Sequence, residues 1–122
     1  VCMWASDIEP QAEGIHASSY DTLGFDELIE SDYIVTNPPW DRMILHPMIE
    51  FFAPKRSTWL LFDADWMHTK QSRRYMPWCR KIVSVGRIKW FGNMTGKDNC
   101  AWYLFKEQWA WDAKPPEFIG RI

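Results

Sequence analysis

The sequence contains few of the residues from which disulfide frameworks, zinc sites and membrane spans are built. Its 122 residues include three cysteines, an odd number without a C-x-x-C pair, and three histidines that share no ligand spacing. We therefore expect reduced thiols and no metal site. No apolar run approaches about 18 residues, as a transmembrane helix requires, and no signal-peptide pattern precedes the first acidic residues. These absences predict a cytoplasmic protein without membrane contact.

Glycine is also scarce, and its spacing matters more than its number. The chain has six glycines, and no two of them stand at G-x-G spacing. A glycine-rich loop lets the backbone approach a nucleotide cofactor closely. No such loop can be identified in this sequence.

Positive charge is missing from the first third of the chain. Residues 1–40 carry eight acidic and no basic side chains, whereas residues 41–122 carry fourteen basic and eight acidic ones. Five of the basic residues fall within twelve positions: Lys70, Arg73, Arg74, Arg80 and Lys81. Such a cluster can contact phosphates. The solvated face of a helix would look the same.

Apolar runs and helical patterns alternate along the chain. Strands are predicted at residues 1–6, 32–37, 57–63, 81–91 and 100–107, with a weaker strand or turn at 14–23. Helices are predicted at residues 25–31, 42–53 and 65–76, the second with a late start or a kink at Pro47 and the third with Asp65 as a possible N-cap. This order predicts one α/β domain over residues 1–122, with a mostly parallel sheet and an antiparallel edge hairpin.

Polar segments follow three of these strands. They are residues 7–10, residues 37–40 and residues 63–66. Ligands of parallel sheets bind outside the carboxyl ends of the strands. The three segments therefore predict an active site at that edge.

The segment Asn37-Pro38-Pro39-Trp40 has the chemistry to bind a planar amino group. The side-chain carbonyl of Asn37 and the backbone carbonyl of Pro38 are both acceptors, and the proline rings fix φ so that their spacing is set. Two acceptors on one –NH₂ group would make its nitrogen lone pair more available for attack. Trp40 offers a flat face on which a heterocyclic base can stack.

This segment resembles the (D/N/S)PP(Y/F/W) motif of the amino-methyltransferases that use S-adenosylmethionine. They include N6-adenine DNA and RNA methyltransferases and release-factor glutamine methyltransferases. The resemblance covers roughly residues 1–106 and implies a Rossmann-like class I methyltransferase sheet. It also implies catalytic roles for Asn37, Pro38, Pro39 and Trp40.

The flanking segments extend the resemblance to cofactor binding. "ASDIEP" is similar to the end of the family's second strand, which implies that Asp7 binds the cofactor ribose and that Ile8 lies against its adenine. Ser18 or Ser19 stands where the family usually has an aspartate that contacts the adenine amine.

The segment at residues 86–105 resembles the late hairpin of phage and restriction-modification adenine methyltransferases, whose loop lies over the flipped base. The resemblance implies that Lys97 and Asn99, within a loop at residues 92–99, contact substrate. A solvent-exposed hairpin loop is the alternative. Arg73 and Arg74 are the basic residues that we assign to the phosphate backbone.

The family's aromatic-x-G-x-G cofactor loop has no counterpart in the sequence. Either the chain is an N-terminally truncated catalytic domain that lacks its first strand, which we favour, or it is a degenerate methyltransferase. The expected activity is methylation of N6 of adenine in DNA. RNA adenine, a protein glutamine, and an inactive nucleic-acid-binding module are the alternatives. A sheet without its cofactor strand would expose an edge, which predicts pairing with another chain or element, as in a homo-oligomer.

Overall fold

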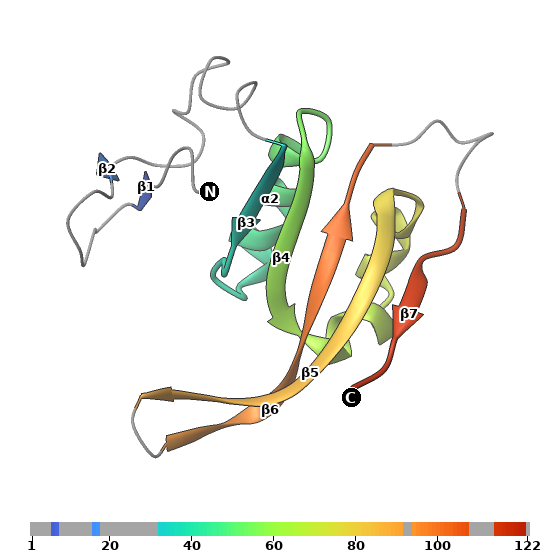
Figure 1. Cartoon of the computed structure of the whole chain (residues 1–122). Helices are drawn as coiled ribbons and strands as arrows, with labels where there is room; N and C mark the ends of the chain where they lie inside the picture. The colour runs from blue at the N-terminus through green and yellow to red at the C-terminus, as the bar shows by residue number, and fades with distance from the viewer. Residues whose placement is uncertain (1–5, 8–15, 18–31, 92–93, 108–113, 122) are drawn as a thin grey trace.

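The computed structural model describes residues 6–7, 16–17, 32–91, 94–107 and 114–121 (Figure 1). The longer elements are the helix α2 (Arg42–Phe52) and the strands β3 (Tyr33–Thr36), β4 (Ser57–Asp63), β5 (Cys79–Phe91) and β6 (Met94–Phe105). The shorter ones are the strands β1 (Ser6–Asp7), β2 (His16–Ala17) and β7 (Glu117–Ile119), and the 3₁₀ segments η2 (Ala64–His68), η3 (Gln71–Arg74) and η4 (Met76–Trp78). The chain therefore has the α/β class that its pattern predicts.

Five strands form a mixed sheet in the order β3-β4-β6-β5-β7. β3 pairs with β4 and β5 pairs with β7 in parallel, whereas β6 is antiparallel to both β4 and β5. Four strands thus run in one direction, which is compatible with a Rossmann-like sheet. The prediction of an antiparallel edge was wrong, because β6 lies inside the sheet and β7, for which no strand was predicted, forms the edge.

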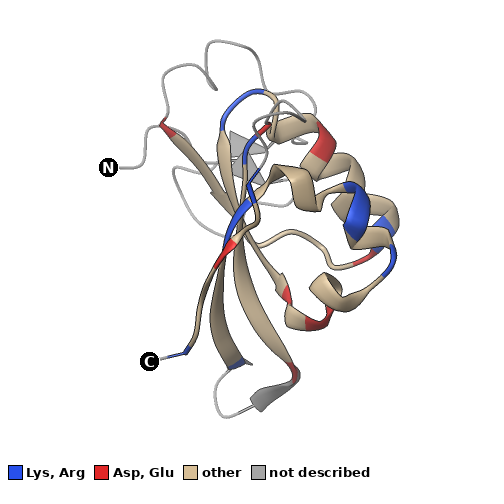
Figure 2. Ribbon diagram, turned by 90° about the vertical axis from the view of Figure 1, so that its right-hand side faces the viewer, with Lys and Arg blue, Asp and Glu red and all other residues tan. Residues whose placement is uncertain are grey.

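All the described helical elements lie on one face of the five-stranded sheet (Figure 2). The core between the two layers contains Leu45 and Ile49 of α2, Leu60 and Phe62 of β4, and Tyr103 of β6, all fully buried. Phe62 stacks on Tyr103 with ring centroids 4.2 Å apart. Alternate residues of β4 and of β6 supply this core, as the pleat of a strand requires.

The helix α2 begins immediately after the Asn-Pro-Pro-Trp segment. Asp41 is its N-cap, and the Asp41 carboxylate accepts a hydrogen bond from the Met43 N–H at 2.9 Å. The helix begins at Arg42 and contains Pro47, which is exposed, so the predicted late start was wrong. Met43, the second residue of the helix, is 83% exposed.

The predicted helix at residues 65–76 is replaced by the three 3₁₀ segments. Two hydroxyls bond backbone carbonyls here: Thr69 Oγ1 donates to the Trp66 carbonyl at 2.7 Å, and Ser72 Oγ donates to the Thr69 carbonyl at 2.8 Å. Such bonds compete with the backbone hydrogen bonds of an α-helix. The N-cap of η2 is Asp63 and not Asp65.

The β5–β6 hairpin is longer than predicted, and its far end projects beyond the other strands (Figure 1). Residues 94–99, predicted as loop, belong to β6. Gly86 has φ +89° beside a register shift between β5 and β6. A glycine is favoured there, because other residues rarely adopt that conformation.

β3 is the edge strand at the other side of the five-stranded sheet from β7. Tyr33 is 56% exposed and Val35 is 63% exposed on this strand. β1 and β2 form a separate parallel pair with no pairing to β3. The helix predicted at residues 25–31 lies outside the described residues.

Candidate active site at the carboxyl edge of the sheet

The carboxyl ends of β3 and β4 lie next to each other. The two strands are parallel, and Thr36 is paired with Leu60. The turn that follows β3, residues 37–41, therefore leaves the sheet at the edge where β4 ends at Asp63. Two of the three polar segments found in the sequence are therefore adjacent in space, as predicted. The third begins at Asp7, the last residue of β1, and β1 belongs to a separate two-stranded sheet.

The Asn-Pro-Pro-Trp turn is partly exposed and partly anchored. Asn37 and Pro39 are exposed, Pro38 is buried, and Trp40 is half-buried and packs against the main core. The amide of Asn37 is thus within reach of a ligand, while the indole of Trp40 is supported from one side.

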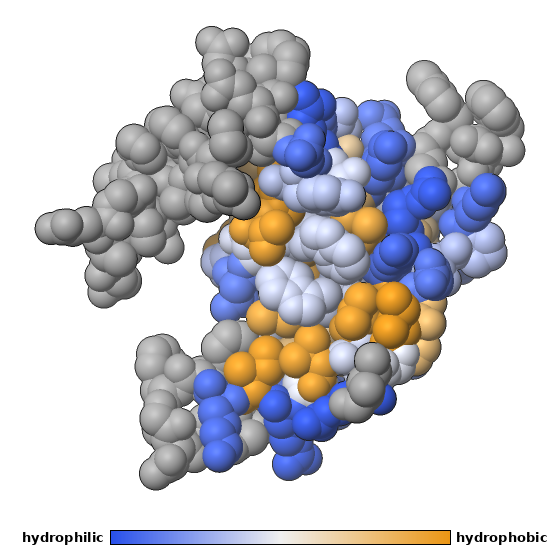
Figure 3. Space-filling view, in the orientation of Figure 1, coloured by the Kyte–Doolittle hydropathy of each residue, from blue (hydrophilic) through white to orange (hydrophobic). Residues whose placement is uncertain are grey.

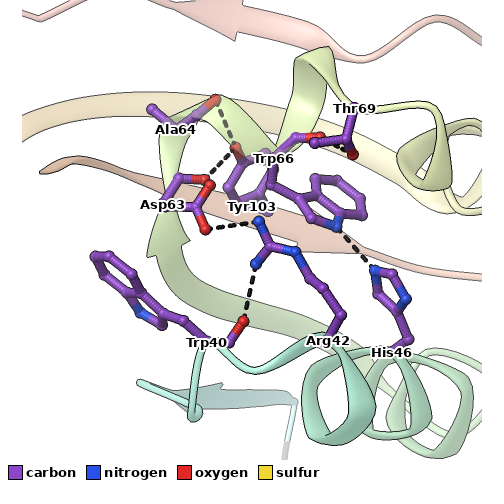
Figure 4. A network of polar contacts seen from close by, with 8 residues as sticks. All are labelled: Trp40, Arg42, His46, Asp63, Ala64, Trp66, Thr69 and Tyr103. Atoms are coloured by element: carbon purple, nitrogen blue, oxygen red, sulfur yellow. Dashed lines mark hydrogen bonds and ion pairs between the residues drawn. The ribbon is translucent and has the colours of Figure 1, made fainter.

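An arginine that follows the motif connects the turn to β4 (Figure 4). Arg42 Nη1 donates to the Trp40 carbonyl at 2.9 Å, and Arg42 Nη2 donates to Asp63 Oδ2 at 2.8 Å. The hydroxyl of Tyr103 donates to the carbonyls of Asp63 at 2.9 Å and Ala64 at 3.2 Å. Reasoning from the sequence missed Arg42, since no pattern distinguished it from other basic residues at a helix start.

A second set of hydrogen-bonded side chains lies between α2 and the 3₁₀ segments. Trp66 Nε1 donates to His46 Nε2 at 3.0 Å (Figure 4). Burial, together with the positive charge of Arg42, lowers the pKa of His46, and the carboxylate of Glu50 partly opposes this. His46 therefore favours the neutral form, which its role as an acceptor requires.

Glu50 of α2 also contacts side chains of the 3₁₀ region. It accepts from the Tyr75 hydroxyl at 3.0 Å and pairs with Arg74 Nη2 at 3.0 Å. Burial, followed by the bond to Glu50, raises the pKa of Tyr75. These contacts attach η3 and the residue after it to α2.

The residues predicted to contact substrate lie on different elements. Asn99 is exposed in β6 opposite Arg87, and Lys97 belongs to β6 as well, although its side chain lies outside the described part. Arg73 and Arg74 are exposed in η3. These residues therefore belong to β6 and η3, whereas the Asn-Pro-Pro-Trp turn lies between β3 and α2.

The basic cluster at residues 70–81 does not form one surface. Val83 lies on the sheet face opposite the helical layer, whereas Ile82 belongs to the core. Lys81, two residues before Val83, lies on the same face as Val83 because strand residues alternate. The sheet therefore separates Lys81 from Arg73 and Arg74.

The face opposite the helical layer carries a shallow apolar hollow of about 260 Å³ (Figure 3). One residue from each of four strands lines it: Val35, Trp59, Val83 and Trp102. None of these four side chains is an acid, a base or a nucleophile. This hollow was not predicted from the sequence, although apolar or aromatic residues recur at alternate positions of the strands that line it.

The cofactor positions predicted from the resemblance are described only in part. Asp7 is the last residue of β1 and is paired with Ala17, the last residue of β2. Ile8, Ser18 and Ser19 lie outside the described residues. Within the described ranges, no three His, Cys, Asp or Glu side chains are placed to hold a metal ion.

Two cysteines are described, and both are buried and unbridged. Burial raises the pKa of Cys79 to about 12. Burial, with the charges of Asp98 and Asp63, also raises the pKa of Cys100. Neither thiol is activated as a nucleophile.

The chain matches no protein-family model, and neither a curated protein nor a solved structure is significantly similar to it. In the part of the chain that the structure describes, no helix is long and apolar enough to cross a membrane.

Proposed function

We propose that the chain transfers a methyl group from S-adenosylmethionine to the exocyclic N6 amine of adenine in DNA. The observation that carries the proposal is the Asn37–Trp40 turn, which leaves β3 beside the end of β4. There it presents an exposed amide and a half-buried indole at the carboxyl edge of the sheet.

The residues of the turn would bind and orient the amine. Asn37 Oδ1 and the Pro38 carbonyl accept its two protons in hydrogen bonds, and Trp40 stacks on a base flipped out of the duplex. When bound, S-adenosylmethionine supplies an electrophilic methyl carbon on a sulfonium. The amine nitrogen forms the new N–C bond as the S–C bond breaks, and the extra proton of the amine is released to solvent.

Asp7 would hold the ribose of the cofactor, and Ile8, Ser18 and Ser19 are the other cofactor positions that the resemblance implies. The support for Asp7 is its place at the end of β1, which pairs in parallel with β2. Ligands bind outside the carboxyl ends of parallel strands. A carboxylate at such an end suits the binding of ribose hydroxyls.

Charge favours a nucleic acid over a protein amide. The region from residue 41 onward carries fourteen basic and eight acidic side chains, and Lys70, Arg73 and Arg74 are exposed on the helical layer. An RNA adenine or a glutamine amide presents the same planar –NH₂ group, so both belong in the test.

The test is transfer of a labelled methyl group to a panel of DNA, RNA and a glutamine-containing peptide. The chain is produced with whatever its reading frame encodes before Val1, and Asn37→Ala is the matched inactive variant. We expect N6-methyladenine in DNA and a loss of about 100-fold or more in Asn37→Ala. Transfer to RNA or peptide alone would change the substrate. Equal transfer by the two proteins would refute the mechanism.

A further inference from the structure

Arg42 is placed where its charge is unfavourable for the helix to which it belongs. It is the first residue of α2, and the first turn of α2 contains no acidic residue. A cation at a helix N-terminus is repelled by the partial positive charge of the free N–H groups. The side chain must therefore gain from its contacts elsewhere.

Those contacts join two segments that are 21 residues apart in the sequence. The guanidinium bonds the Trp40 carbonyl and the Asp63 carboxylate, and the two charged side chains are only 30% and 15% exposed. Charge-assisted bonds of this length are stronger than neutral ones, and partial burial limits their screening. A guanidinium, unlike an ammonium, can make both bonds in one fixed geometry.

The Asp63 end of this connection is itself fixed. The Tyr103 hydroxyl holds the Asp63 carbonyl. The remaining carboxylate oxygen, Asp63 Oδ1, is buried, and it is the one buried side-chain nitrogen or oxygen of the described residues without a hydrogen-bond partner. Loss of Arg42 would therefore leave this carboxylate buried without either oxygen bonded.

The connection restricts the backbone of the turn further. The proline rings fix φ at Pro38 and Pro39, and the helix cap holds Asp41. The ψ angles and the Trp40 backbone are not fixed by these features, and the Trp40 carbonyl is the group that Arg42 holds. Rotation there would move the Trp40 ring relative to the two acceptors of Asn37 and Pro38.

We infer that Arg42 and Asp63 are positioning residues that set the geometry of the Asn37–Trp40 turn. Arg42 bonds the Trp40 carbonyl, and Asp63 orients Arg42 from the end of β4. Neither residue touches the reacting atoms. The catalytic part of this inference rests on the proposed function, whereas its geometric part does not.

The geometric part can be tested without substrate. Labelling Trp with ¹³C at the carbonyl and Asp with ¹⁵N selects the two Trp-Asp pairs of the chain, at residues 40–41 and 111–112. Trp111→Phe identifies the Trp40 carbonyl signal. We expect Arg42→Lys to shift this signal upfield, because an ammonium cannot keep both bonds. An unshifted signal would overturn the inference.

Arg56→Lys is the matched control. Arg56 also donates to a backbone carbonyl, that of Lys55 at 3.1 Å, beyond the other end of α2. The same substitution there should leave the Trp40 carbonyl signal and the rate of methyl transfer unchanged. A shift of equal size in both variants would mean that an arginine-to-lysine substitution at either end of α2 moves the Trp40 carbonyl signal. That result would overturn the role of Arg42.

The catalytic part is tested by kinetics. We expect Arg42→Lys to lower kcat for methyl transfer by at least about 10-fold with KM for the methyl donor unchanged, because a misplaced acceptor affects the reaction rather than donor binding. Asp63→Asn keeps an acceptor oxygen for Arg42 and should restore most of kcat relative to Asp63→Leu. Wild-type kcat in Arg42→Lys would overturn the positioning role. If the wild-type chain transfers no methyl group, the proposed function fails, and the carbonyl signal still decides whether Arg42 holds the turn.

Discussion

Removal of one hydroxyl from the core gives a direct test of how the end of β4 is held. Tyr103 is fully buried, and its hydroxyl donates to the carbonyls of Asp63 at 2.9 Å and Ala64 at 3.2 Å. Tyr103→Phe keeps the ring and its stacking on Phe62 but removes the donor. A buried acceptor that loses its partner costs roughly 1–3 kcal/mol. We expect a destabilisation of about 1–2 kcal/mol, which corresponds to a fall in Tm of roughly 4–8 °C.

The assay is urea unfolding followed by tryptophan fluorescence, with thermal unfolding by circular dichroism as a second probe. Tyr33→Phe is the control, because the Tyr33 side chain is 56% exposed on the edge strand. Removal of its hydroxyl should change stability by less than about 0.5 kcal/mol. Equal stability of Tyr103→Phe and the wild-type chain would refute the reasoning, since it would mean that the two carbonyls do not depend on this donor.

Three further predictions concern the cap of α2, His46 and the thiols. Asp41→Ala removes the bond to the Met43 N–H and should cost about 1 kcal/mol by urea unfolding; Asp41→Asn should cost much less, and equal losses would argue against the cap. The folded pKa of His46 is lowered, so the unfolded chain binds its proton more readily. Its contribution to stability should be full above about pH 6.5 and decline as pH falls below that value. Thermal unfolding at pH 7.5 and 5.5 should show a smaller fall in His46→Gln than in the wild-type chain, and an equal fall in both would contradict the assignment. Because burial raises the pKa of Cys79 to about 12 and Cys100 is buried as well, a Cys2→Ser variant should react with a thiol reagent at pH 8 only when it unfolds. Rapid reaction of the folded variant would contradict this burial.

Four of the five strands of the main sheet could be predicted from the sequence because each contains an apolar run bounded by polar or proline residues, whereas the short strand β7 was missed. The strand at residues 57–63 has the bounds that its composition indicated. The order of the strands could not be predicted. The insertion of β6 between β4 and β5 depends on pairing across the sheet, and no local pattern encodes it. The three 3₁₀ segments were missed because the hydroxyl bonds of Thr69 and Ser72 override the helical spacing of their neighbours.

The candidate site shows the same division. Polar residues after parallel strands predicted which segments meet at the carboxyl edge, and the pairing of Thr36 with Leu60 confirms that residues 37–41 and Asp63 are neighbours. The role of Arg42 could not be predicted, since its two partners are known only once the strands are placed. The prediction of one basic surface at residues 70–81 was wrong. Residues of this cluster are close in the sequence, but they lie on the two faces of the sheet.

The central claim is that Asn37 binds the amine that is methylated, and substitution of this one side chain tests it most directly. Asn37→Leu keeps the approximate size of the side chain and removes the acceptor, whereas Asn37→Asp keeps an acceptor oxygen at the same place. The measurement is N6-methyladenine formed in DNA by each variant, quantified by mass spectrometry of the digested nucleosides. We expect Asn37→Leu to lose about 100-fold or more in kcat while Asn37→Asp retains transfer. Transfer by Asn37→Leu at the rate of the wild-type chain would contradict the claim.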